Sequence, residues 1–258
     1  MEILLYIFAG AAVGLAVGIT GVGGGSLMTP LLILFGFPYH VAIGTDLLYA
    51  SITKAGGVIS HQREKHINWR IVAALGAGSI PAAIITTLLL RTVFTHADEY
   101  KELLTTSLGI MLLITSLVLL FKSRLQPSSP SGAGHWLQNH ATPVTVVMGV
   151  FLGVFVTLSS VGAGAIGTAI LMILYPVLQA RHIVGTDIAH AVPLTLVAGL
   201  GHMLFLGNVD FVLLACLLMG SLPAVSLGTK IGAKLPNHVL QPVLAFILMG
   251  LGIKFAAF

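Results

Sequence analysis

Charged residues are scarce in this chain, at 8% of 258 residues, against roughly 25% in an ordinary soluble domain. Hydrophobic residues make up 57%, and no soluble fold could remove that much apolar surface from water. Cysteine is nearly absent as well, since Cys216 is the only one, which excludes a disulfide framework and a cysteine metal site within one chain. The composition therefore predicts a chain that lies in the bilayer from end to end.

Several functional motifs are also missing. No nucleotide-binding loop of the form Gly-x-x-x-x-Gly-Lys-Ser/Thr occurs, so the chain cannot drive a process with its own ATP hydrolysis. The net charge of +4 comes from scattered Lys and Arg residues, without the basic stripe and interleaved aromatics of a nucleic-acid-binding protein. The start, Met1-Glu2, lacks the basic region of a signal peptide, so we expect the first apolar segment to stay in the mature protein.

Ten apolar runs follow one another along the chain, in two sets of five. A polar, proline-rich stretch between Lys122 and His140 separates the sets and is typical of an exposed linker. The second run of each set is shorter than the about 20 residues of a full span and follows a glycine-rich break, which predicts a half-helix or a re-entrant segment. The predicted runs are 3–19, 24–36, 42–62, 69–91, 102–121, 142–159, 164–178, 183–206, 209–229 and 237–257.

The two sets repeat each other in sequence. At an offset of 139 (149 minus 10), the matching residues are Gly10, Gly14, Val22, Gly23 and Gly25 with Gly149, Gly153, Val161, Gly162 and Gly164. At an offset of 141, residues 44–46 match 185–187 and His61 matches His202, and at 142 residues 78–81 match 220–223. Each half has an odd number of membrane crossings, whether it is counted as five segments or as three spans plus a hairpin. Consecutive copies must therefore point in opposite directions through the membrane. We therefore expect an all-α polytopic membrane protein with two inverted-topology repeats, residues 1–121 and 142–258, joined by a cytoplasmic linker over 122–141.

The basic residues predict the orientation, because Lys and Arg accumulate in cytoplasmic loops. Four loops, those after the third, fifth, seventh and ninth runs, carry eight of the twelve, and all four fall on one side of the membrane. The exceptions are Arg91 and Lys101, in an external loop that also holds acidic residues, and Lys254 near the C-terminus. We expect a multi-pass protein of the cell membrane with this side cytoplasmic and both termini outside. The loop residues are Arg63, Lys65, Arg70, Lys122, Arg124, Arg181, Lys230 and Lys234.

Five short motifs occur in a fixed order in the first half. They are Gly21-Val22-Gly23-Gly24-Gly25 followed by Pro30, Gly36-Phe37-Pro38, Ala42-Ile43-Gly44-Thr45, Ile67-Asn68-Trp69-Arg70 and Gly78-Ser79-Ile80-Pro81. This order resembles the sulfite exporter TauE/SafE family, also called the toluene-sulfonate uptake permease family, over nearly the whole chain. The resemblance implies a secondary transporter for small sulfur-containing anions, such as sulfite, sulfonates, sulfoacetate or thiosulfate, coupled to protons.

The second copy of the pattern is looser than the first. It has Ala163 where the first copy has Gly24, and Ala169 where the first has Pro30. The two half-sites therefore need not contribute equally to binding.

The two glycine breaks are the candidate anion site. Glycine lets backbone approach a ligand closely, and a helix that starts after the break directs its N–H groups and positive dipole end toward an anion. Close helix packing is the alternative explanation, and we expect it for Gly10, Gly14 and Gly18. With Lys54 as the one cation, the expected substrate-binding residues are Gly23, Gly24, Gly25, Ser26, Thr45, Lys54, Gly162, Ala163, Gly164 and Thr186.

Three charged residues lie well inside predicted membrane segments, namely Asp46, Lys54 and Asp187, and such charges are usually functional. His190 follows Asp187 by three residues and could exchange a proton near neutral pH. We expect Asp46, Asp187 and His190 to couple transport to protons. The alternatives are helix capping for the carboxylates, snorkelling for Lys54 and an interhelical hydrogen bond for His190.

Two other functions remain open. An anion channel could use the glycine breaks, although two inverted copies that move against each other fit a carrier better. An intramembrane enzyme could use Ser26, Ser159 or Ser160 as nucleophile with His190 or His202 as base. However, the chain has no Gly-x-Ser-x-Gly elbow and a hydrolase has no need of the duplication.

We expect no catalytic residues, no cofactor and no metal ion. The spacing of five between His61 and His66 does not place both imidazoles on one helix face, which argues against zinc. The expected partners are the anion and the lipid bilayer, not nucleic acid. The sequence leaves open the identity of the anion, the direction of transport and the oligomeric state, with a homodimer as one alternative.

Overall fold

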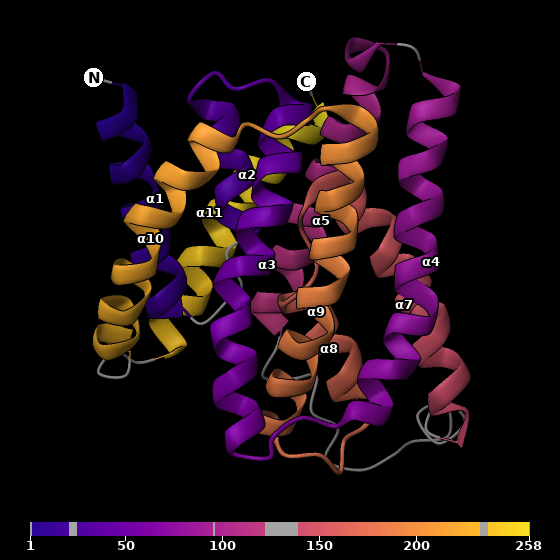
Figure 1. Cartoon of the computed structure of the whole chain (residues 1–258). Helices are drawn as coiled ribbons and strands as arrows, with labels where there is room; N and C mark the ends of the chain where they lie inside the picture. The colour runs from indigo at the N-terminus through magenta and orange to yellow at the C-terminus, as the bar shows by residue number, and fades with distance from the viewer. Residues whose placement is uncertain (1, 21–24, 95, 122–138, 233–236, 258) are drawn as a thin grey trace.

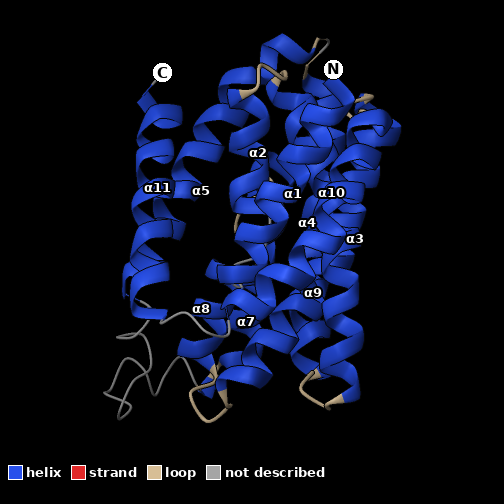
Figure 2. Cartoon of the chain, turned by 90° about the vertical axis from the view of Figure 1, so that its left-hand side faces the viewer, coloured by secondary structure: helices blue, strands red, loops and turns tan. Residues whose placement is uncertain are grey.

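The computed structural model describes residues 2–20, 25–94, 96–121, 139–232 and 237–257, and within these ranges the chain forms helices and loops without a strand (Figures 1 and 2). The first half contains α1 (Glu2–Thr20), α2 (Gly25–Leu34), α3 (Tyr39–Arg63), α4 (Trp69–Val93), η1 (Ala97–Tyr100) and α5 (Lys101–Phe121). The second half contains α7 (Ala141–Ser159), α8 (Ala165–Leu174), α9 (Ala180–Gly201), η3 (His202–Leu206), α10 (Phe211–Gly232) and α11 (Asn237–Ala257).

The lengths of these helices match the predicted apolar runs. Among the described residues, five helices are long and apolar enough to cross a membrane: α4, α5, α7, α9 with η3, and α10. Helices α2 and α8 have only 10 residues each, or about 15 Å at 1.5 Å per residue. They reach across about half of a hydrocarbon core of about 30 Å, so the expectation of two short helices is confirmed.

Capping residues fix where α4 and α10 begin. The side chain of Asn68 accepts hydrogen bonds from the backbone N–H groups of Arg70 at 3.2 Å and Ile71 at 3.4 Å. Asp210 does the same for α10, where its Oδ1 accepts from the N–H of Leu213 at 2.9 Å. Each cap satisfies donors that have no partner within the helix. Both helices therefore start at corresponding places in the two halves, since 210 minus 68 is 142.

Glycines bring α1 and α10 into close backbone contact. A Cβ atom added at Gly10 would collide with the backbone of Leu217, and one added at Gly14 would lie 2.7 Å from the backbone of Ser221. Gly18 continues the row against α10. The packing explanation expected for these three glycines is thus confirmed. Helices α4 and α7 pair in the same way through glycines at 78, 149 and 153.

The contacts also give the direction of each helix pair. Residue numbers rise together in α1 against α10 and in α4 against α7, so both pairs are parallel. Between α3 and α9 the residue numbers change in opposite directions, because Leu48 contacts Gly199 and Gly57 lies next to Ile188. The same holds between α5 and α11. Figure 2 shows α5 beside α11. The corresponding helices of the two halves, α3 with α9 and α5 with α11, are therefore antiparallel.

The ends of the bundle differ in charge. Figure 1 shows the N- and C-terminal ends at one end of the bundle and the connection from α3 to α4 at the other. The second end carries Arg63, Lys65, Arg70, Arg181 and Lys230, and we call it the basic face.

Candidate functional site

A cavity of about 290 Å³ lies inside the bundle on the side of the basic face. Its walls come from the ends of α1, α5 and α10, the second half of α3, the first half of α9, the break between α7 and α8, and the start of α8. Lys54 is the only Lys or Arg among the described residues that line it. The lining residues are Val17, Gly18, Thr53, Lys54, Gly57, Leu119, Ala163, Gly164, Ala165, Thr168, Val184, Asp187, Ile188, Ala191, Val225 and Thr229.

Lys54 connects the two halves of the chain within this cavity. Its Nζ donates a hydrogen bond of 2.8 Å to the carbonyl oxygen of Ala163, 109 residues away. The lysine stands near the middle of α3 and its side chain is half-buried, which argues against snorkelling as its role. The structure thus brings together Lys54, Ala163, Gly164 and Asp187, four of the residues expected from the sequence.

The break between α7 and α8 has a backbone that few residues can adopt. Ser160, the residue that caps the end of α7, has a φ of 58°, a left-handed conformation that is uncommon outside glycine. Gly164 then has φ of 142° immediately before α8 begins at Ala165. The N–H of Thr168 returns to the carbonyl of Gly164 at 3.0 Å, which starts the helix. The positive end of the α8 dipole therefore faces the break and the cavity.

A hydroxyl and a carboxylate form the same pair in both halves. Thr168 Oγ1 on α8 donates to Asp187 Oδ2 on α9 at 3.0 Å, and Thr29 Oγ1 on α2 donates to Asp46 Oδ2 on α3 at 2.6 Å. Each carboxylate lies seven residues after the first residue of its helix, since 46 minus 39 and 187 minus 180 are both 7. Helix capping, the alternative for both carboxylates, is therefore wrong.

The two carboxylates differ in their surroundings. Both are buried, with 1% of Asp187 and none of Asp46 exposed, but Asp187 lines the cavity and Asp46 does not. Both lie close enough to Lys54 to interact with its charge. The charge of Lys54 therefore interacts with two carboxylates, of which only Asp187 lines the cavity.

His190 is fully buried and hydrogen-bonded between helices. Its Nε2 lies 2.8 Å from Ser79 Oγ on α4, so the interhelical hydrogen bond considered for this histidine is present. The corresponding residue in the first half is Tyr49 (190 minus 141), which interacts with Ser221 on α10. Ser79 and Ser221 are themselves matched at offset 142, so the whole pair is repeated. A role of His190 in proton coupling remains a prediction.

Thr45 and Thr186 anchor helix ends and do not line the cavity. The hydroxyl of Thr45 accepts a hydrogen bond from the backbone N–H of Asp210 at 3.1 Å, and that of Thr186 accepts one from the N–H of Asn68 at 3.0 Å. Each threonine thus ties its helix to the first residue before α10 or α4.

The remaining expected residues belong to the two breaks. Gly23 and Gly24 lie outside the described residues, Gly25 is the first residue of α2, and Ser26 is buried. Gly162 is buried with φ of 118°, and a Cβ there would meet the methyl of Met111 at 2.6 Å.

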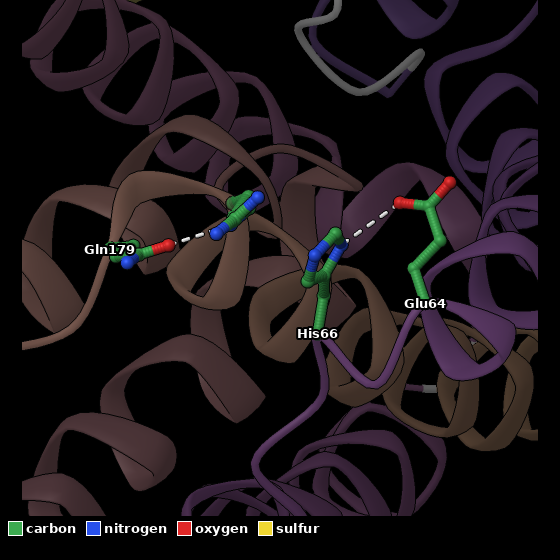
Figure 3. A network of polar contacts seen from close by, with 4 residues as sticks. Glu64, His66 and Gln179 are labelled. Atoms are coloured by element: carbon green, nitrogen blue, oxygen red, sulfur yellow. Dashed lines mark hydrogen bonds and ion pairs between the residues drawn. The ribbon is translucent and has the colours of Figure 1, made fainter.

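Three histidines, His61, His66 and His182, gather at the basic face. The ring of His66 lies 5.9 Å from that of His61 and 5.1 Å from that of His182, measured between centroids. Figure 3 shows His66 Nδ1 pointing at the carboxylate of Glu64, 3.0 Å away. Among the described residues, no group of three His, Cys, Asp or Glu side chains could hold a metal ion. The cluster joins the α3–α4 loop to the start of α9, so it links the two halves.

Comparison with known proteins agrees with this architecture. The family model of the sulfite exporter TauE/SafE matches residues 6–255. The probable membrane transporter protein YjnA of Bacillus subtilis (strain 168) is 40% identical over 256 residues, which cover 96% of this chain and 97% of YjnA. YdhB of the same organism, also a probable membrane transporter protein, is 30% identical over 93% of this chain and 94% of its own length.

A more distant relative comes from an archaeon. The probable membrane transporter protein MJ0441 of Methanocaldococcus jannaschii is 27% identical over 96% of this chain and 93% of its own length. No solved structure matches the chain. Because the family model and these relatives cover nearly the full length, the chain is a multi-pass membrane protein that belongs to the sulfite exporter TauE/SafE family.

Proposed function

We propose that this protein is a secondary transporter that moves a small sulfur-containing anion, of the sulfite, sulfonate, sulfoacetate or thiosulfate type, across the cytoplasmic membrane. The observation that carries the proposal is Lys54, a cation inside an apolar bundle that lines a cavity and contacts the break before α8. Charged groups inside membrane segments are usually functional, and an anion in this cavity would share the charge of Lys54 with Asp46 and Asp187.

The chemistry of the cavity suits a small oxyanion. An ammonium group has three donors, and Lys54 uses one of them on the carbonyl of Ala163, which leaves two for a ligand. The N-terminal end of α8 adds its dipole at the same place. At about 30 Å³ for each water, a cavity of about 290 Å³ has room for an anion with part of its hydration shell.

A single cation also permits release. Several arginines in a low-dielectric interior would hold an anion too tightly for a transporter. Asp187 lines the same cavity, and its negative charge opposes anion binding. Protonation of this carboxylate would remove that opposition, so we propose that a proton enters with the anion and that Asp187, with Asp46 and His190, couples transport to protons.

We further propose that the halves are inverted repeats that alternate access between the two faces. In the sequence repeat, α1 corresponds to α7, α4 to α10 and α3 to α9. An exchange of the two halves therefore converts the parallel pair of α1 with α10 into the parallel pair of α7 with α4, and converts the antiparallel pair of α3 with α9 into itself. This symmetry of contacts supports the proposal. The lysines and arginines of the basic face support a cytoplasmic location for that face, with both termini outside.

A flux assay in proteoliposomes tests the function. Purified protein would be given sulfite, thiosulfate, sulfoacetate or sulfate, with and without a pH gradient. We expect at least one sulfur anion to be taken up faster with the gradient, and Lys54→Gln to abolish that uptake. Lys101→Gln is the matched control, because Lys101 is exposed near η1 and stacks on Tyr39 outside the cavity.

The same assay separates a carrier from the alternatives. A carrier preloaded with unlabelled anion accelerates uptake of labelled anion, whereas a channel does not. An intramembrane enzyme would convert its substrate without moving it. Absence of flux for every anion tested, or uptake unchanged in Lys54→Gln, would contradict the proposal.

A further inference from the structure

Twelve of the 16 residues that line the cavity, which we call the open cavity, are compared with the counterparts that the offsets of the sequence repeat give them in the other half. The offset is 139 for the first helix and the break, 141 for α3 with α9 and 142 for α4 with α10. The pairs are Val17 with Val156, Gly18 with Thr157, Thr168 with Thr29, Thr53 with Leu194, Lys54 with Thr195, Gly57 with Ala198, Val184 with Ile43, Asp187 with Asp46, Ile188 with Leu47, Ala191 with Ala50, Val225 with Ala83 and Thr229 with Thr87.

The counterparts are fully buried, whereas most of the residues that line the open cavity are partly exposed. In the open cavity Lys54 and Gly57 are half-buried and Thr229 is exposed. Their counterparts Thr195 and Ala198 have no exposed surface, and Thr87 is 1% exposed. Every other counterpart in these pairs is also fully buried. The two halves thus place equivalent residues in opposite states, one open and one closed.

The closed set lies toward the other end of the bundle. The open cavity uses the second half of α3 and the first half of α9, and the closed set uses the first half of α3 and the second half of α9. Because α3 and α9 are antiparallel, these two combinations lie at opposite ends. The closed set therefore belongs to the face opposite the basic face.

We infer that the chain holds a second anion-access cavity on the face opposite the basic face, closed in this structure, which opens when the two halves exchange their packing. The inference rests on the proposed transport function. Two halves with matched contacts can each adopt the packing now seen in the other, so the two arrangements are alternative states of one molecule. Opening one cavity then closes the other.

The two cavities differ in charge. The position of Lys54 is taken by Thr195, so the second cavity is lined by hydroxyls from Thr87, Thr157 and Thr195 without that ammonium. It would take the same class of ligand, a small sulfur oxyanion, but bind it more weakly. Exchange would also bury Lys54 as deeply as Thr195 is now, so the lysine would need an anion or a carboxylate as partner in that state.

Cysteine labelling in sealed vesicles tests the inference. On a Cys216→Ala background, single variants would be treated with a membrane-impermeant thiol reagent added to one face at a time. Gly57→Cys and Thr229→Cys report on the open cavity, and their counterparts Ala198→Cys and Thr87→Cys report on the second. A Cβ at Gly57 makes only an ordinary contact of 3.5 Å with Ile188, so this substitution fits.

We expect Gly57→Cys and Thr229→Cys to react from the basic face, and Ala198→Cys and Thr87→Cys to react from the opposite face. Ala245→Cys, fully buried in α11, is the silent control from both faces. The inference is overturned if Ala198→Cys and Thr87→Cys react no faster than Ala245→Cys, or react from the basic face. Flux of sulfite, thiosulfate and sulfoacetate by the Cys216→Ala parent is measured in parallel. Absence of flux together with opposite-face labelling would contradict the function alone, and normal flux without opposite-face labelling would contradict the second cavity alone.

Discussion

The first and second halves of this molecule pack alike but differ in chemistry at the cavity. The pairs of α1 with α10 and α4 with α7 use glycines in matching places, and a threonine holds a carboxylate in each half. In contrast, Lys54 of the first half corresponds to Thr195 in the second, and Tyr49 corresponds to His190. The comparison indicates that helix packing requires both copies, whereas one cation is sufficient for the site.

The largest effect is expected where the halves are most alike. Gly14→Leu and Gly149→Leu each place a side chain against the backbone of a neighbouring helix, α10 or α4. Overpacking costs about 1–3 kcal/mol or more, so we expect both variants to lose most of their folded protein to a similar degree. Thermal unfolding in detergent measures this. Gly250→Leu is the control, since a Cβ there meets nothing within 4 Å; a loss confined to one of the two test variants would break the comparison.

Moving the cation tests where the halves differ. A hydrogen bond to a charged group contributes about 1.5–3 kcal/mol, so Lys54→Thr should weaken anion affinity at the basic face by at least about tenfold. The double variant with Thr195→Lys should regain affinity at the opposite face only. Side-specific half-saturation constants in oriented vesicles give the answer. Recovery at the basic face would show that the position of the charge does not matter.

The carboxylates should act as a pair. Asp46→Asn and Asp187→Asn keep an oxygen that can accept from Thr29 or Thr168 but remove the titrating group. We expect both variants to insert normally and to lose the stimulation of flux by a pH gradient. Glu102→Gln, an exposed carboxylate at the start of α5, should retain it. If either aspartate variant responds to the gradient as the unmodified protein does, that carboxylate is not a coupling residue.

The smallest effect is expected at the threonine anchors. Thr45→Val and Thr186→Val each remove one hydrogen bond to a backbone N–H, which costs about 1 kcal/mol of stability. The two losses should be equal, and anion affinity should not change because neither residue lines the cavity. Chemical denaturation and binding titrations measure the two quantities. A drop in anion affinity at unchanged stability would show that these threonines belong to the anion site after all.

The helices could be predicted from the sequence because their signals are local. Apolar run length gave ten segments, and the glycines and prolines at their ends gave boundaries within a few residues of the structure. The two 10-residue helices followed from runs too short to span a membrane.

The site could be predicted only in part. Lys54 and the break at 162–164 were expected together, because an intramembrane cation and a helix N-terminus both suit an anion. The partners of the hydroxyls could not be predicted, since Thr45 meets Asp210 across 165 residues. Thr168 was missed altogether, although its match to Thr29 at offset 139 was a usable signal. Repeated polar residues on both sides of a contact, such as Ser79 and Ser221, carry similar information.

Direct binding of an anion at Lys54 is the measurement that tests the central claim. Calorimetric titration of purified protein with sulfite and with thiosulfate would compare the unmodified chain, Lys54→Gln and the control Lys101→Gln. The account predicts saturable binding of at least one anion to the unmodified chain and to Lys101→Gln, and a loss of at least about tenfold in affinity for Lys54→Gln. Equal affinity in Lys54→Gln and the unmodified chain would show that the anion binds elsewhere and would contradict the account.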